Sequence, residues 1–194
     1  MTNPRADGFV TAYPCGTRTL VASINYVAGQ TVSNAVIAPV SPNGTVCFYS
    51  HAMADIVVDI NGWFAPGAML QSVGPARVFD TRGESPNAMR TVAIGKVGGA
   101  NVLEVKVTDL GVGVPATGVA AVSLNVAVTN PVGPGFVTVF PCGPRKLVAS
   151  VNYSAGETVS NAVIAPVSAT GTVCFYAYAA TDIVVDVNGW FLTN

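Results

Sequence analysis

Apolar and polar residues alternate along most of the chain in a way that predicts strands. Residues 103–108, Leu-Glu-Val-Lys-Val-Thr, alternate with a period of two, which places the valines on one face and Glu104 and Lys106 on the other. Residues 121–128 show the same alternation. Turn signals rich in Gly, Pro and Asn separate such stretches, and no segment longer than a turn or two has a helical period. The pattern predicts an all-β fold, either an antiparallel β-sandwich of jelly-roll-like form or a barrel.

One long stretch of the chain occurs twice. Residues 8–64 align without a gap with residues 135–191, an offset of 127, and 43 of the 57 positions are identical. Residues 67–128, here called the front half, have no second copy. We therefore interpret the chain as one and a half copies of a repeat of about 127 residues. The complete unit is residues 67–194, and the half unit, residues 1–66, is the back half of a preceding unit.

The half unit is expected to need a partner. Without a front half it would present open strand edges and an uncovered apolar face, and open edges pair with other chains. The front half could be shared by both back halves, or the half unit could dock on a neighbouring chain. A third interpretation is that the chain is an excised piece of a tandem array, with Met1 as its artificial start.

Composition narrows the class of function. Only 10% of the residues are charged and the net charge is −1, whereas about 25% are charged in an average soluble domain. Such a chain lacks the basic patches that capture nucleic acid or an anionic membrane surface. No apolar stretch reaches the roughly 18 residues of a membrane helix, and no signal peptide is visible. A weakly charged surface does little to oppose association between copies.

The four cysteines carry the clearest chemical signal. Each copy of the repeat has one pair separated by 32 residues: Cys15 with Cys47, and Cys142 with Cys174. Three pairings are possible among four cysteines, and the repeat selects the one that closes both copies in the same way. Zinc is the alternative, but no closely spaced cysteines are present, so we expect no metal. Disulfides predict a location outside the cytosol.

The complete unit contains an ordered set of short motifs: RVFDTR, GVPA, AVSLNVAVT, GFVTVFPCG, NYSAGETVSNAVIAPVS, GTVCFY and TDIVVDVNGWF. This order resembles a β-rich repeat of large secreted and cell-wall-associated actinobacterial proteins. The resemblance covers residues 76–191 as a whole unit and residues 8–64 as a half. Such repeats are often appended to peptidases, amidases and other hydrolases, or strung in tandem. The resemblance implies an extracellular accessory module and transfers no catalytic residues.

The repeated motif DIVVDxNGWF is one candidate site. On a strand, Asp55, Asp59, Asn61 and Trp63 would share one face. Their counterparts in the second copy are Asp182, Asp186, Asn188 and Trp190. Asp55 and Asp59 would lie about 13 Å apart, beyond the roughly 5–9.5 Å of paired glycosidase carboxylates. Calcium at Asp59 and Asn61 is an alternative. We expect instead that these side chains bond to loop backbone at a strand end.

The sequence RVFDTR is a second candidate. Asp80 and Arg82 point the same way on a strand, and an arginine fork can hold a carboxylate through two hydrogen bonds. The interpretation is a structural ion-pair group of Arg77, Asp80 and Arg82 that reaches Asp186 across the unit. The alternative is a polar pocket for a sugar or for a peptide carboxylate.

Three further residue sets are informative. The tryptophans and tyrosines are expected to pack in the core or at its ends, with a sugar-stacking platform as the alternative. Asparagines inside apolar strands predict a buried hydrogen-bond network, because an unpaired buried amide is costly; they are Asn25, Asn34, Asn125, Asn152 and Asn161. Gly62 and Gly189 are predicted to lie in a bulge or at positive φ.

These patterns do not favour catalysis. The single histidine, His51, is replaced by Tyr178 in the other copy, and the cysteines are expected in disulfides. The sequence predicts a non-catalytic extracellular structural repeat, a spacer, adhesion or surface-assembly element whose partners are copies of itself or adjacent repeats. No cofactor is expected. The alternative is a carbohydrate- or cell-wall-binding accessory module of a secreted hydrolase.

Overall fold

A computed structural model describes residues 1–18, 20–32, 34–58, 60, 63–64, 69–99, 101–145 and 148–193. All regular structure in these residues is strand. The strands are β1 (Gly8–Pro14), β2 (Ile24–Tyr26), β3 (Val46–Ser50), β4 (Leu70–Asp80), β5 (Val102–Lys106), β6 (Val119–Thr129), β7 (Gly135–Pro141), β8 (Val151–Tyr153), β9 (Val159–Pro166), β10 (Thr172–Ala177) and β11 (Asp182–Leu192). In the part of the chain described, no helix has the length and apolarity needed to cross a membrane.

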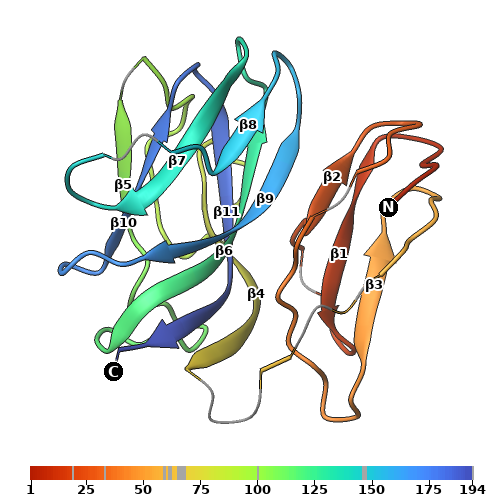
Figure 1. Ribbon diagram of the computed structural model, residues 1–194, viewed down its shortest axis with the longest axis horizontal. Coiled ribbons are helices and arrows are strands. Elements are labelled where there is room, and N and C mark those ends of the chain that lie inside the picture. The colour runs from red at the N-terminus through yellow and green to blue at the C-terminus, as the bar shows by residue number, and fades with distance from the viewer. Residues whose placement is uncertain are drawn as a thin grey trace.

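The complete unit is an antiparallel β-sandwich. One sheet has the strand order β5-β10-β7-β8 and the other β4-β11-β6-β9. Both sheets remain open, so the sandwich alternative is confirmed and the barrel alternative is wrong. Figure 1 shows the two sheets of this unit facing each other, with β4, β6 and β11 on one side and β5, β7 and β10 on the other.

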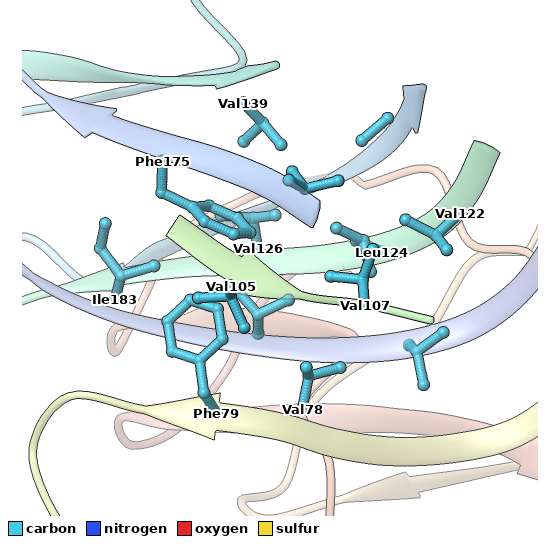
Figure 2. Close-up of a cluster of buried hydrophobic side chains, with 14 of the residues drawn as sticks. Val78, Phe79, Val105, Val107, Val122, Leu124, Val126, Val139, Phe175 and Ile183 are labelled. Carbon is cyan, nitrogen blue, oxygen red and sulfur yellow. The ribbon is translucent and has the colours of Figure 1, made fainter. Parts of the chain in front are cut away.

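Strand alternation builds the core of the sandwich. Val122, Leu124 and Val126 of β6 are fully buried, as the period-two pattern of that segment predicts. Phe79 of β4 and Phe175 of β10 meet edge to face between the sheets, with ring centroids 5.1 Å apart. Figure 2 shows both rings among the valines of the two sheets. One continuous apolar cluster therefore holds the front half and the second back half together.

The central strand β11 departs from simple alternation. Its pairing with both neighbours shifts between Val187 and Gly189, which leaves Asn188 in a bulge. The bulge turns Trp190 into the core beside Val187, so Trp190 does not share the face of Asp186 as predicted. The bulge expected near Gly189 is present, but this glycine is not at positive φ.

A close backbone approach explains why position 189 is glycine. A Cβ at Gly189 would lie 2.9 Å from the carbonyl oxygen of Gln71 in β4, closer than real side chains come. The equivalent Gly62 lies outside the described residues.

The half unit forms a separate sheet. Its order β2-β1-β3 corresponds to β8-β7-β10 of the complete unit, strand for strand. Figure 1 shows this sheet, in red and orange, beside β9 and β6. Among the described residues, all three strands of the front half pair with strands of the second copy, and none with β1, β2 or β3. The two back halves therefore do not share the front half through strand pairing in the described residues.

Candidate functional site: a polar cluster and the contact between repeats

Both predicted disulfides are present. Cys15 pairs with Cys47 and Cys142 with Cys174, each with a Cα–Cα distance of 4.9 Å. Each bond ties the residue after one strand (β1 or β7) to the neighbouring strand (β3 or β10). In the described part of the chain, the one group of side chains with metal-ligand spacing combines Glu104 with Cys142 and Cys174, whose sulfurs are already bonded to each other. Two disulfides indicate an oxidising environment.

Asp80, at the end of β4, is the centre of the RVFDTR group. It is 6% exposed and accepts two hydrogen bonds from the Arg82 guanidinium, at 3.0 and 2.8 Å. The backbone amide of Arg82 and the hydroxyl of Ser85 add bonds of 2.9 and 2.8 Å. Burial raises the pKa of Asp80, but the bonds from Arg82 and Ser85 outweigh it and hold this pKa at about 2.

Arg77 joins this group to the central strand. Its guanidinium donates to Ser85 at 2.7 Å and to Asp80 at 3.2 Å, and its Nε donates to Asp186 of β11. Asp186 is 1% exposed. Burial raises the pKa of Asp186 to about 6, against the opposing effects of Arg77 and Asn125.

The cluster of Arg77, Asp80, Arg82 and Asp186 thus forms one network, including the ion pair predicted across the unit. Its two carboxylates are buried and occupied by arginines of the chain itself. A ligand carboxylate would have to compete with these two carboxylates and, at Arg82, with the exposed Glu84, whose Oε2 lies 3.1 Å from Nη1. The arrangement clamps β4 to β11 and the loop that follows β4, which is a structural task.

Two further interactions were not anticipated from the sequence. Lys96 donates to the carboxylate of Asp182 at 2.8 Å and to the backbone carbonyl of Asn130 at 2.6 Å. Arg90 donates to the carbonyl oxygens of Lys106 and Thr108, at 3.0 and 2.7 Å. Lys96 and Arg90 lie in the loop between β4 and β5, where no periodic pattern marks a partner.

The structure separates the two copies of the DIVVDxNGWF motif. Asp182, Asp186, Asn188 and Trp190 are all buried within or beside β11. In the first copy, Trp63 is 81% exposed and Asp55 accepts a hydrogen bond from the Asn3 side chain at 3.0 Å. Asp59 and Asn61 lie outside the described residues, as does the calcium alternative that depends on them. A shared sequence therefore occupies two different environments.

A second polar group lies where the half unit meets the complete unit. Asn125 of β6 is 5% exposed and donates to the carbonyl oxygen of Ala22. Asn34 donates to Asn125 at 3.5 Å, and its side-chain oxygen accepts the backbone amide of Ala162 at 3.2 Å. The predicted asparagine network is thus present at Asn34 and Asn125, where it crosses between repeats.

The network does not include all five asparagines. Asn152 and Asn161 are exposed, because their side chains point away from the sandwich core. Asn161 donates only to the carbonyl oxygen of Ser150, at 2.9 Å, which repeats the bond from Asn34 to Ser23 at 2.8 Å. The two copies share this local bond, and only Asn34 also reaches across to another unit.

Equivalent aromatic pairs account for the single histidine. His51 stacks on Phe9 with ring centroids 5.3 Å apart, and Tyr178 stacks on Phe136 at 5.5 Å. The two pairs occupy the same place in the two copies. His51 therefore makes a packing contact with Phe9, and Tyr178 makes the equivalent contact with Phe136.

Comparison of the chain with protein-family models, with curated proteins and with solved structures finds no match. The fold and the polar groups define a disulfide-linked all-β protein built from one complete sandwich and a docked half unit.

Proposed function

We propose that this chain is a non-catalytic, secreted structural module in which one repeat packs on the next. It acts as a spacer or surface-assembly element, and its partners are adjacent repeats or copies of itself. The observation that carries the proposal is the contact of Asn34 with Asn125 and Ala162, which joins the half unit to the complete unit.

This contact has the properties of a specific joint. Strand β9 is an edge strand of its sheet, and Asn34 caps its Ala162 amide. Asn125 is buried, so its amide must be paired, and Ala22 supplies the carbonyl. A buried polar contact specifies one orientation of the partners more strictly than an apolar contact does. Successive repeats joined in this way would keep a fixed mutual geometry, which suits a spacer.

The polar cluster supports the same function. Asp80 and Asp186 are engaged by Arg77 and Arg82, and each has a structural role between β4 and β11. The exposed Trp63 is not an argument for sugar binding, since its counterpart Trp190 is 9% exposed within the complete core. In the complete unit, the front-half strands β4 and β6 flank Trp190 on both sides.

A matched pair of variants tests the proposed joint. Asn34→Ala removes the local bond to Ser23 and the contacts with Asn125 and Ala162, whereas Asn161→Ala removes only the equivalent local bond. We expect small-angle X-ray scattering to show a wider, more flexible particle for Asn34→Ala and an unchanged one for Asn161→Ala. Identical scattering of both variants would contradict a specific joint.

A binding assay tests the wider function. The intact chain is incubated with purified peptidoglycan and with cell-wall polysaccharides, and the bound fraction is measured by sedimentation. We expect no specific binding. Saturable binding that Trp63→Ala abolishes would replace the structural proposal by that of a cell-wall-binding accessory module.

A further inference from the structure

Identical sequences adopt different structures in the two copies of the repeat. Residues 31–41 and 158–168 are the same eleven amino acids. In the second copy they contain β9, which pairs with β6 along its whole length. In the first copy, the described residues 31–32 and 34–41 belong to no strand. The two copies differ in their neighbours: β6 lies beside the second copy, and no strand of the described residues lies in the equivalent place beside the first.

The segment equivalent to β11 is uncovered for the same reason. Val57 is 68% exposed, Val58 52% and Ile60 87%, whereas their counterparts Val184, Val185 and Val187 are at most 6% exposed. Apolar side chains concentrated on one short stretch mark an interaction surface. In the complete unit, β4 and β6 cover both edges of this stretch.

The first residues of the chain already hold the last positions of a β6-type strand. Thr2 pairs with Asp55 in an isolated antiparallel bridge, as Thr129 pairs with Asp182 at the end of β6. Val32 donates its backbone amide to the carbonyl oxygen of Met1, in the place of the Val128–Val159 pair. These contacts fix the direction and register in which a β6-type strand would continue.

We propose that the half unit is an acceptor for the front half of a further repeat of this type. The incoming β6-type strand would lie antiparallel to residues 55–58 and beside residues 34–39, ending next to Met1. This inference rests on the proposed function, and names the partner through which repeats associate. The complete unit shows how such a segment is completed, since the equivalent residues of β11 pair there with β4 on one edge and with β6 on the other.

A second copy of residues 1–194 does not fill this acceptor site without a loss elsewhere. These residues contain two back halves and one front half. A front half given to another chain would therefore uncover the donor's own second back half. The partner must bring a front half that no other back half uses, as a strand with inward Val and Leu and outward Ser and Asn, like β6.

An extended chain tests the proposal. A duplicate of residues 67–127 is placed before Met1, so that Met1 takes the place of Val128. Amide exchange is compared at residues 55–58 and 182–185, which are the same tetrapeptide, DIVV. In the intact chain we expect the first segment to exchange at least about 100-fold faster than the second, and in the extended chain to come within about tenfold of it. The fluorescence of Trp63 is obtained by subtracting the signal of the Trp63→Phe variant from that of the unsubstituted chain. In the extended chain, acrylamide should quench Trp63 no more than it quenches Trp190.

The matched control keeps the extension but not its apolar face. The added counterparts of Val122, Leu124 and Val126 are replaced by threonine, which retains β propensity. Residues 55–58 should then exchange as fast as in the intact chain. A second arm needs no folded extension and uses a peptide of the β6 residues Val119–Ala127 with two added lysines. This peptide should slow exchange at residues 55–58 of the intact chain. It should not change exchange at residues 55–58 of the extended chain, whose site is already filled.

The outcomes separate the alternatives. Fast exchange at residues 55–58 with both the extension and the peptide would overturn the proposal. A symmetric dimer of the intact chain that already protects these residues would also overturn it, in favour of a second copy as occupant. If Asn34→Ala and Asn161→Ala scatter identically but the extension slows exchange at residues 55–58, the proposed joint is contradicted and the acceptor site is supported.

Discussion

Asp186 should make the complete unit less stable as pH rises from about 4 to about 6. An aspartate in water has a pKa of 3.8, and burial raises the pKa of Asp186 to about 6 in the folded protein. Between these values the folded state holds a proton that the unfolded state has released, so the free energy of unfolding falls with rising pH. One pKa unit corresponds to about 1.36 kcal/mol, so the loss is roughly 3 kcal/mol between pH 3 and pH 7.

Asp80 acts in the opposite direction and at lower pH. Its pKa is about 2 in the folded protein against 3.8 in water, so its contribution is present above about pH 4 and is lost as the pH falls through 2. The pH ranges in which Asp80 and Asp186 change the unfolding free energy meet near pH 4. Between about pH 4 and pH 7, Asp186 is therefore the member of the polar cluster that changes charge.

The variant Asp186→Asn isolates this effect, because asparagine keeps the shape and an acceptor oxygen but does not titrate. We expect the difference in unfolding free energy, variant minus wild type, to rise by roughly 3 kcal/mol between about pH 3.5 and pH 7. Urea unfolding followed by Trp190 fluorescence measures it, since Trp190 is 9% exposed and Trp63 already 81%. Asp109→Asn is the control, as this exposed residue has φ of 59°, which asparagine also tolerates. Parallel pH profiles for wild type and Asp186→Asn would refute the reasoning.

Three further changes probe the sandwich. Removing the Cys142–Cys174 bond by a double change to alanine should lower the unfolding free energy by about 3–4 kcal/mol, since it closes a 32-residue loop, and an unchanged urea midpoint would contradict this. Gly189→Val should cost at least about 2 kcal/mol through its clash with β4; an unaltered melting temperature would argue against the close approach. Trp190→Ala should cost about 3–5 kcal/mol and Trp63→Ala less than about 0.5, so equal thermal shifts would contradict the burial difference.

Much of the complete unit could be predicted because its signals are local. Period-two alternation marks Val122, Leu124 and Val126 as core residues of a strand, and the structure confirms it. The disulfide pairing followed from the repeat, because two copies of one fold must close alike. The ion pair from Arg77 to Asp186 was predicted because an arginine can hold a carboxylate and a carboxylate inside an apolar strand needs a partner.

Other features depend on contacts far apart in sequence. The bulge near Gly189 was predicted, but its effect on Trp190 was not, because the two-residue period still placed Trp190 on the face of Asp186. Lys96 finds Asp182 from a loop, where spacing carries no information about the partner. Asn34 and Asn161 occupy equivalent positions in the two copies, yet only Asn34 reaches another unit. The residues that form the joint between repeats could therefore not be predicted from the sequence of either copy alone.

The two copies of residues 31–41 show why the half unit could not be read from its own sequence. With eleven identical residues, local propensity is the same in both copies, yet among the described residues a strand forms only where β6 lies alongside. Strand formation here depends on the free energy of pairing and of covering the apolar face, which is a property of the partner rather than of the segment. The front half thus decides whether a back half becomes a sandwich. In a series of such repeats, we therefore expect each back half to require its own front half.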